Sequence, residues 1–334
     1  MDLTGKKVLF IAPKHYYLEG KIIDYLHMMG AEVTYYPEVV YNRVYTLIRD
    51  KTFSPLNKML DALYFNKILR NIDKNQYDIF FLIRGGMIDV DFLEKIRNKL
   101  PNAYFVMYQW DSVIHNDYKS KIKYFDYSLT FDQVDAQKLH IDYLPLFYLQ
   151  ECENIQNMRD NMIFDISFFG TFHSDRLSVI KKVALECKEK NLKFHYHLYA
   201  GKINIFLLLL RRKISFSDIK YFKSYGASLS EIIQQYTISK AVLDIEMTNQ
   251  IGLTLRTLET LGAGRKLLTT NLNVKDSEVF DKNFIQIIDR EKPRINVDFL
   301  NSPIKETNLY EQYHISRWLM QIMSKNRDDE ELKI

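Results

Sequence analysis

The sequence predicts an α/β protein built from two tandem, doubly wound, Rossmann-like domains. Short, continuous apolar runs alternate along the chain with helical patterns, which is typical of a parallel sheet covered by helices on both faces. The alternation pauses in a polar stretch at 150–161 and then restarts. The length of 334 residues is also enough for two domains of about 150 residues each.

Six strands are predicted in the first half of the chain. Each is an apolar run bounded by turn-forming or polar residues, and they span 7–12, 31–36, 78–83, 103–108, 127–130 and 141–144. Helical patterns cover about 19–29, 42–74 and 89–99. Gly30 stands at the C-cap of the first helix. Asp89-Val90-Asp91 is predicted to form the first turn of the third helix, where carboxylates suit the helix dipole.

The second half repeats this alternation of strands and helices. Strands are predicted at 165–171, 194–199, 241–245, 266–270 and 284–288, and helices at 175–190, 230–236, 252–262 and 310–323. We therefore expect an N-terminal domain at 1–155 and a C-terminal domain at 156–308, facing each other across a cleft. Residues 309–334 are expected to form a helix and tail that return to the N-terminal domain.

Composition narrows the classes of function. With 47 % apolar residues, 11 glycines and 7 prolines, the chain can bury a large core and is not of a disordered type. The net charge of +4 is too small, and the basic residues too dispersed, to indicate a nucleic-acid partner. The two cysteines, Cys152 and Cys187, cannot form a disulfide framework or a four-thiolate zinc site. Residues 1–7 lack the core of a secretory signal, and the longest apolar run, 205–210, is far shorter than the ~20 residues of a membrane span, so we expect a cytoplasmic protein.

The most informative segment is the helix predicted to open at Gly252. The backbone N–H groups of Gly252, Leu253 and Thr254 precede or begin this helix, and together with the Thr254 hydroxyl they can bind a phosphate. Arg256 can meet a diphosphate in fork geometry, and Glu259 can accept two hydrogen bonds from a ribose diol. The alternative is a surface helix on which Arg256 and Glu259 form an i,i+3 ion pair worth a few tenths of a kcal/mol.

This segment resembles a known signature. The pattern Gly-Leu-Thr-x-Arg-Thr-x-Glu at 252–259, followed by Lys-Leu-Leu-Thr-Thr-Asn at 266–271, resembles the donor site of GT-B glycosyltransferases. The resemblance is to the bacterial lipopolysaccharide or capsule biosynthesis group, which is related to the spore-coat-type group 1 transferases. Ser-Phe-Phe-Gly-Thr at 167–171 resembles the first strand and glycine loop of that family's C-terminal domain. The specific resemblance covers about 165–271 and is only architectural before that.

The resemblance implies roles for several residues. Glu259 would hold the nucleotide ribose, and Gly252 to Thr254 with Arg256 would hold the diphosphate. Many retaining members of the family carry a second glutamate eight positions before the first, where this sequence has Ile251. The donor-sugar contact of that glutamate is therefore missing or supplied elsewhere, and the stereochemical outcome stays open.

A second group of donor-side candidates follows the strand at 165–171. His173 and Arg176 come after Gly170, where we expect a phosphate or sugar of the donor. Gly170 is a lone glycine and not a dinucleotide fingerprint. His195 and His197 alternate in a strand without a third ligand at metal spacing, so we interpret them as structural. We expect no metal and no cofactor other than the nucleotide-sugar co-substrate, because the helix end and its arginine can carry the diphosphate charge.

The N-terminal half is then expected to bind the acceptor. Asp111 follows Trp110 directly after a strand and could act as a general base on an acceptor hydroxyl, or it could cap a following helix. His15 is a second candidate base, since neutral imidazole works near pH 7, or else a solvated loop histidine. Arg84 and Gly85 end another strand, where they could bind an anionic acceptor or simply form a tight turn.

The segment 206–213 combines an apolar run with a basic cluster. It predicts either peripheral attachment to an anionic membrane, where lipid-linked acceptors reside, or a core helix with a cationic C-terminal end.

The sequence thus favours a metal-independent glycosyltransferase. It would move a sugar from a nucleotide-diphosphate-sugar to a saccharide or lipid-linked saccharide acceptor of lipopolysaccharide, capsule or exopolysaccharide biosynthesis. The protein would be cytoplasmic, with or without peripheral contact at the inner face of the membrane, and would not bind nucleic acid. Two alternatives stay open: a nucleotide-sugar epimerase of the same architecture, and a non-catalytic nucleotide-sugar-binding protein, which Ile251 motivates.

Overall fold

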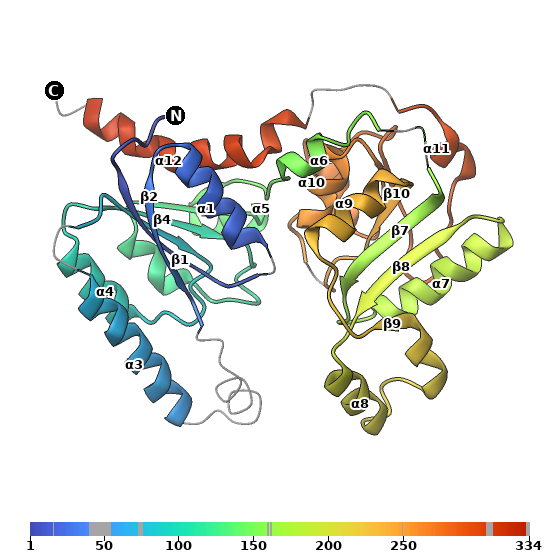
Figure 1. Ribbon diagram of the computed structural model, residues 1–334, viewed down its shortest axis with the longest axis horizontal. Helices are drawn as coiled ribbons and strands as arrows, with labels where there is room; N and C mark the ends of the chain where they lie inside the picture. The colour runs from blue at the N-terminus through green and yellow to red at the C-terminus, as the bar shows by residue number, and fades with distance from the viewer. Residues whose placement is uncertain are drawn as a thin grey trace. The chain divides into compact units, whose positions relative to one another are not determined.

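The chain folds into two compact units, and each contains one six-stranded parallel sheet (Figure 1). The computed structural model describes residues 1–15, 17–39, 55–72, 76–158, 160, 162–248, 250–304 and 310–331. Unit 1 comprises Met1–Pro145 and Ser316–Ile334, and unit 2 comprises Leu146–Ile315. The predicted class, two Rossmann-like α/β domains, is confirmed. The first unit ends before the boundary expected at 155, and the second continues beyond the one expected at 308.

Unit 1 has the strand order β2-β1-β3-β4-β5-β6. The six strands are β1 Lys7–Ala12, β2 Glu32–Pro37, β3 Ile79–Ile83, β4 Tyr104–Gln109, β5 Tyr127–Thr130 and β6 Asp142–Tyr143. The helical segments are α1 Leu18–Met28, α3 Pro55–Asn71, α4 Val90–Lys99, η1 Lys119–Tyr124, α5 Gln133–Leu139 and α12 Ile315–Glu331. Asp89 caps α4 by accepting a hydrogen bond from the Phe92 amide, which confirms the predicted first turn. Of the helical region expected at 42–74, residues 42–54, 73 and 74 lie outside the described residues.

Unit 2 has the strand order β12-β11-β10-β7-β8-β9. Its strands are β7 Phe164–Thr171, β8 Phe194–Tyr199, β9 Phe222–Lys223, β10 Ser239–Asp244, β11 Lys266–Thr269 and β12 Ile285–Ile287. The helical segments are α6 Gln150–Glu153, α7 Arg176–Glu189, α8 Lys202–Leu210, η2 Phe216–Tyr221, α9 Leu229–Thr237, α10 Leu255–Gly262, η3 Leu272–Asp276, α11 Val297–Asn301 and η4 Glu311–Tyr313.

The C-terminal helix α12 completes the core of unit 1. Its Trp318 is buried and meets the ring of Tyr108 edge-on, with ring centroids 4.8 Å apart. Phe81 of β3 lies 6.5 Å from the same indole ring. The last helix of the chain therefore packs on the sheet formed by the first half of the sequence, as a helix that returns to the N-terminal domain should (Figure 1).

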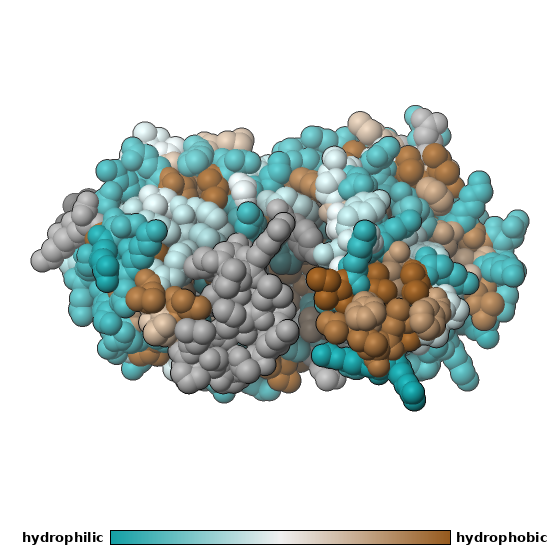
Figure 2. All heavy atoms as spheres, turned by 60° about the horizontal axis from the view of Figure 1, so that its bottom comes forward, coloured by the Kyte–Doolittle hydropathy of each residue, from teal (hydrophilic) through white to brown (hydrophobic). Residues whose placement is uncertain are grey.

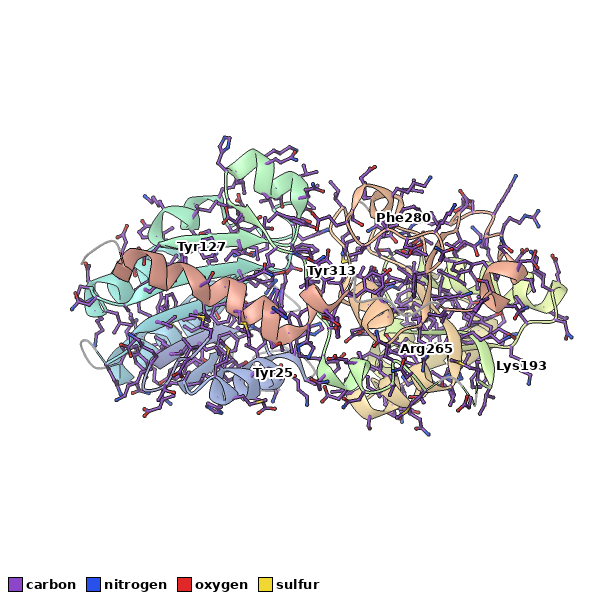
Figure 3. All side chains as sticks on the ribbon, turned by 90° about the horizontal axis from the view of Figure 1, so that it is seen from above. Tyr25, Tyr127, Lys193, Arg265, Phe280 and Tyr313 are labelled. Atoms are coloured by element: carbon purple, nitrogen blue, oxygen red, sulfur yellow. The ribbon has the colours of Figure 1, made fainter. Side chains whose placement is uncertain are left out.

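Hydrogen bonds from the buried Arg265, just before β11, connect the first segment of unit 2 to its sheet. Arg265 has no exposed surface and lies in the interior of the unit (Figure 3). Its guanidinium donates to the backbone carbonyls of Tyr236 at 2.7 Å, Met158 at 2.6 Å and Ile155 at 3.1 Å. Backbone oxygens thus satisfy a buried cation, and they join the segment after α6 to the end of α9.

The helix α8 departs from expectation. The sequence predicts that 206–213 is either a membrane contact or a core helix, but α8 contains no buried residue. The core-helix alternative is therefore only partly right: Ile205, Leu208 and Leu209 pack against the core of unit 2 but are not fully buried, and the other face of α8 is exposed. No helix in the described part of the chain is long and apolar enough to cross a membrane.

Gly262, at the end of α10, packs so closely against a neighbouring ring that a larger side chain should destabilise the protein. A Cβ atom there would lie 2.5 Å from Cδ2 of the buried Tyr148 ring. Gly262→Ala should therefore lower the free energy of unfolding by about 1–3 kcal/mol, measured by urea denaturation. Gly20→Ala is the matched control, because Gly20 is exposed in α1 and a Cβ atom there would have no neighbour within 4 Å. It should raise the free energy of unfolding by about 0.5–1 kcal/mol. Equal effects of the two substitutions would contradict the packing argument.

Candidate functional site

The strand order of unit 2 locates a candidate ligand site. The chain runs outward from β7 through β8 to β9, and then restarts on the other side of β7 with β10. All strands of the sheet are parallel, so the carboxyl ends of β7 and β10 lie at the same edge. In doubly wound sheets, ligands bind at this point, outside the carboxyl ends of the strands where the order reverses. Gly170 lies near the end of β7, and Asp244 is the last residue of β10.

The helix after β10 begins later than predicted. α10 starts at Leu255, with Thr254 as its N-cap, so the prediction that Gly252 opens the helix is wrong. Thr254 can cap because its hydroxyl oxygen accepts the Thr257 amide at 3.1 Å, which a glycine cannot do. Gly252 and Leu253 are buried in the preceding loop. The Thr254 hydroxyl, expected as a donor to phosphate, instead donates to Asp244 at 2.7 Å.

Asp244 anchors this region, and the sequence analysis missed it. Its side chain is fully buried and accepts the Thr257 hydroxyl at 3.1 Å in addition to that of Thr254. Arg256 forms an ion pair with it through Nη1, also at 3.1 Å. A negative charge at a helix N-terminus is favourable, so this carboxylate fixes the start of α10. The signal available in the sequence was an acidic residue ending an apolar strand shortly before the helix.

Two guanidinium groups meet above Phe168 of β7. The Cζ atoms of Arg256 and Arg176 lie 5.3 Å and 5.8 Å, respectively, from the centroid of that ring. Arg176 is held by the carbonyls of Ile245 and Thr171, both at 2.8 Å. The predicted arginines, Arg176 and Arg256, are thus brought together by the fold.

Gly170 makes room for these arginines. A Cβ atom at Gly170 would lie 3.0 Å from Nη1 of Arg176 and 3.4 Å from Nη2 of Arg256. Gly170 does not form the turn predicted for it: it lies within β7, paired with Leu198 of β8. The glycine therefore matters for space and not for an unusual backbone angle.

Burial and neighbouring arginines lower two pKa values in this cluster. Burial and the neighbouring Arg256 lower the pKa of Arg176 to about 9. Desolvation lowers the pKa of His173 to about 4, and the charges of Arg176 and Arg256 act in the same direction. A bound anion would relieve both effects, because it favours the charged form of each neighbour.

The rest of the cluster contains charges that the sequence analysis did not single out. Arg290, which follows β12, pairs with Asp175 at 2.7 Å and also with Glu246. The Thr270 hydroxyl donates to the same Glu246. Burial raises the pKa of Glu246, whereas the hydrogen bonds from Thr270 and Arg290 oppose the rise. These residues come from separate loops, so no local pattern in the sequence joins them.

Glu259 lies in the interior of unit 2. Only 5 % of it is exposed, and its carboxylate accepts the Tyr236 hydroxyl at 3.5 Å. The neighbouring positions of α10 from Thr257 to Gly262 are also buried, so the surface-helix alternative is wrong. Ile251 occupies the position of the second glutamate in many retaining members of the resembled family. Its backbone carbonyl accepts a hydrogen bond of 3.4 Å from the side-chain amide of Asn271.

Unit 1 has its own switch point, between β1 and β3. His15 follows β1, Arg84 follows β3 and Asp111 follows the neighbouring β4. Arg84 bridges two carboxylates: Nε pairs with Asp111 at 2.7 Å, and Nη1 pairs with the buried Glu38 at 3.2 Å. The capping alternative for Asp111 is wrong, because the next helical segment, η1, begins only at Lys119.

The backbone after β3 is held in an unusual conformation. Arg84 and Gly85 have φ angles of 67° and 64°, so the tight turn predicted there is present. The Arg84 carbonyl accepts the side-chain amides of Gln109 at 2.9 Å and Asn116 at 3.0 Å. The Lys121 ammonium donates to the Gly85 carbonyl at 2.6 Å. A non-glycine residue at positive φ is strained, and these buried contacts keep it in place.

His15 and Glu38 are two groups here with shifted pKa values. Desolvation lowers the pKa of His15, whereas the carboxylates of Glu19 and Asp111 oppose the shift. Its ring lies 6.0 Å from that of Trp110, so the two predicted residues are neighbours. Burial raises the pKa of Glu38, and its Oε2 atom is buried without a hydrogen-bond partner among the described residues. Glu38 lies just after β2, and no pattern in the local sequence singles it out.

The candidate metal ligands are accounted for by packing. His197 shares a hydrogen bond of 2.8 Å with the Tyr225 carbonyl and stacks on Phe169. His195 packs against Phe164 and Phe169. In the part of the chain that the structure covers, no three His, Cys, Asp or Glu side chains are grouped so that they could hold a metal ion.

Comparison with known proteins identifies the fold. No family model and no curated protein matches the sequence. Among solved structures, the chain is similar to Anabaena HepE in complex with UDP and glucose, with TM-score 0.58, 12 % identity and coverage of 97 % of this chain and 100 % of that one. It is also similar to the lipopolysaccharide outer core galactosyltransferase WaaB, with TM-score 0.53, 13 % identity and coverage of 96 % and 99 %. A third match is Methanocaldococcus jannaschii UDP-GlcNAc 2-epimerase with UDP-GlcNAc and UDP, with TM-score 0.56, 10 % identity and coverage of 96 % and 99 %. The chain therefore has the GT-B fold predicted from its donor-site pattern.

The burial of His173 beside the arginine cluster predicts an unusually low pKa for this histidine. In the ligand-free protein, His173 should titrate near a pKa of about 4, as followed by side-chain nitrogen chemical shifts. Because this pKa lies below that of the unfolded chain, the unfolded state takes up the proton first. Protonation of His173 in the unfolded state therefore lowers the free energy of unfolding as the pH falls from about 6.5 to about 4.

Substitution tests the cause of that shift. Arg256→Gln removes one of the positive charges and should raise the pKa of His173. Arg211→Gln, on an exposed arginine after α8, is the control and should leave the pKa unchanged. An ordinary pKa of His173 in the unsubstituted protein would contradict the positive potential of the cluster.

Proposed function

We propose that this protein is a glycosyltransferase that uses a nucleotide-diphosphate-sugar donor. The observation that carries the proposal is the pair Arg176 and Arg256 at the switch point of unit 2, where the described hydrogen bonds of the Arg176 guanidinium go to backbone carbonyls and not to a carboxylate. Burial is the main cause of the lowered pKa values of Arg176 and His173, and the neighbouring arginines add to it. A diphosphate would give the Arg176 guanidinium an anionic partner, and it is the leaving group of such a donor.

The donor would be bound by unit 2 alone. In this proposal the guanidinium groups of Arg176 and Arg256 hold the diphosphate, with the loop at Gly252 and Leu253 beside it. Glu259 accepts the ribose hydroxyls, and His173 lies near the phosphates or the sugar. The charge that develops on the leaving diphosphate is then offset by arginines already fixed in position, so transfer would proceed without a metal.

The acceptor would be bound by unit 1. Asp111 or His15 would take the proton from the acceptor hydroxyl, and Arg84 would contact an anionic group of the acceptor. Trp110 offers a ring on which a sugar can stack. We propose a saccharide or lipid-linked saccharide of lipopolysaccharide, capsule or exopolysaccharide biosynthesis, on the cytoplasmic side of the membrane, as the acceptor.

A second candidate function is epimerisation of the nucleotide sugar. It is favoured by the similarity in fold to a UDP-GlcNAc 2-epimerase. An epimerase changes the donor without any acceptor, whereas a transferase releases nucleoside diphosphate and needs an acceptor. A non-catalytic binder would do neither. Incubation with the donor alone, followed by separation of the nucleotide sugars, distinguishes the three.

Glu259 provides a direct test of the donor site. Glu259→Gln keeps the size of the side chain and an acceptor for Tyr236 but removes the charge that strengthens hydrogen bonds to a ribose diol. Calorimetric affinity for nucleoside diphosphates should fall about 10- to 100-fold, with the thermal midpoint of the ligand-free protein maintained. Glu189→Gln, on an exposed glutamate of α7, is the matched control. Unchanged affinity in the Glu259 variant would exclude the ribose assignment.

Asp111 provides the corresponding test of the acceptor side. Asp111→Asn removes the base while keeping a group able to hydrogen bond Arg84, so transfer to the acceptor should fall by about 100- to 10,000-fold. Nucleotide binding should not change, because the donor residues lie in unit 2. Asp117→Asn, an exposed carboxylate of the same unit, serves as the control. If Asp111→Asn retains turnover and His15→Gln loses it, the base is His15.

A further inference from the structure

The helix α8 carries apolar residues on two opposite faces, although it lies on the surface of unit 2. One face, formed by Ile205, Leu208 and Leu209, packs against the hydrophobic core of the unit. The other face is exposed and consists of Ile203, Phe206, Leu207 and Leu210, with exposed fractions of 74 %, 59 %, 37 % and 63 %. A helix on the surface of a water-soluble domain normally places polar residues outward. The exposed face of α8 therefore needs an explanation other than packing within the unit.

The exposed apolar surface continues into η2. Phe216 is 82 % exposed and Ile219 is 39 % exposed. We call these six residues the apolar patch: Ile203, Phe206, Leu207, Leu210, Phe216 and Ile219. Figure 2 shows hydrophobic residues gathered over this part of unit 2, bordered by hydrophilic ones. Contiguous exposed apolar surface of this kind marks an interaction site.

The charges around the apolar patch are almost all positive. Six basic side chains lie between 202 and 223, all of them exposed: Lys202, Arg211, Arg212, Lys213, Lys220 and Lys223. The single acid in that range, Asp218, is buried and paired with Lys181. The patch is therefore an apolar surface with a cationic border.

The end of α8 fixes part of this border. Arg212 has a left-handed φ of 52°, and the amides of Arg212 and Lys213 donate to the carbonyls of Leu209 and Leu208, each at 2.9 Å. This is the hydrogen-bond pattern of a Schellman motif, in which glycine is the usual residue at the left-handed position. The chain has arginine there, so a basic side chain is held directly beside the last apolar turn.

We propose that the apolar patch docks on the surface of a bilayer that contains anionic phospholipids. The apolar side chains would enter the boundary between headgroups and acyl chains, and the cationic border would contact the lipid phosphates. A second copy of this chain fits less well, because it would bring a second set of six basic residues against the first. The helix has nine residues, so it would lie in the plane of the membrane surface and not cross it.

The position of α8 determines which edge of the unit 2 sheet would face the bilayer. Gly201, its N-cap, follows the carboxyl end of β8 by two residues. Because the sheet is parallel, this is the same edge at which β7 and β10 end. Docking would therefore turn the edge that carries Arg176 and Arg256 toward the bilayer. Membrane docking does not depend on the proposed function, whereas a lipid-linked acceptor would depend on it.

Vesicle binding by the full-length protein tests the proposal. The protein is mixed with phosphatidylcholine vesicles with or without phosphatidylglycerol, and the bound fraction is measured by flotation. We expect binding to the anionic vesicles, weak binding to the neutral ones, and a decrease with added salt. Phe206→Ser with Leu210→Ser should reduce binding at least about tenfold. Arg211→Gln with Arg212→Asn and Lys213→Gln should reduce it about 100-fold, since each cation near an anionic surface contributes a factor of about five.

Matched variants test whether binding depends on the apolar patch and its basic border, or on any exposed apolar or basic residue of unit 2. Leu185→Ser removes an exposed leucine of α7, and Lys188→Gln with Lys275→Gln and Lys282→Gln removes three exposed lysines elsewhere in unit 2. These variants should bind like the unsubstituted protein. Nucleotide affinity and thermal midpoint, measured on every variant, report whether unit 2 is intact and test the donor site separately.

Three results would overturn the proposal. One is an absence of binding to anionic vesicles, and another is an equal loss of binding in the patch and control variants. The third is a dimer in lipid-free solution, seen by light scattering, that Phe206→Ser with Leu210→Ser dissociates. That result would identify a second copy of the chain as the occupant of the patch.

Discussion

The buried carboxylate of Asp244 makes the interactions on which the switch point of unit 2 depends. It ends β10 without exposed surface and accepts hydrogen bonds from Thr254 and Thr257 at the start of α10. It also pairs with Arg256. An isolated buried charge is strongly unfavourable, so the strand end, the helix start and the arginine must come together for any of them to be stable. In this way one acid fixes the geometry of the helix and holds a guanidinium next to Arg176 before any ligand arrives.

Unit 1 uses the same arrangement with a different balance of charge. Arg84 lies between Glu38 and Asp111 at the end of its strand. There burial raises the pKa of Glu38, whereas Arg84 and Lys121 oppose the rise. In unit 2, Arg256 and Arg290 are paired with carboxylates, and the Arg176 guanidinium donates to backbone carbonyls. Burial and the neighbouring arginines lower the pKa values of His173 and Arg176. A carboxyl group with a raised pKa suits proton transfer, and an arginine without a carboxylate partner suits a diphosphate, which is the basis of the proposed division of acceptor and donor between the units.

The wrong predictions from sequence have specific physical causes. A glycine after a strand resembles a phosphate-binding turn, which favours Gly252 as the start of α10, whereas the cap is decided by a threonine side chain that also reaches Asp244. Gly170 resembles a turn residue, but its role is to leave space for Arg176 and Arg256, which depends on residues far along the chain. An apolar run such as that of α8 predicts burial, and its exposure follows only from where the helix meets the core.

The sequence by itself determined the two parallel sheets, because strands buried on both faces need continuous apolar runs that are visible locally. The sequence also shows that Arg256 and Glu259 stand three residues apart in a helical pattern, which the structure contains as α10. Only the tertiary structure decided which charges meet. Asp244 and Glu246 reach the switch point from the end of β10 and Arg290 from the end of β12, and in unit 1 Glu38 and Arg84 come from the ends of β2 and β3. Strand order sets these encounters, and it arises from packing the whole sheet, so no short stretch of sequence contains it.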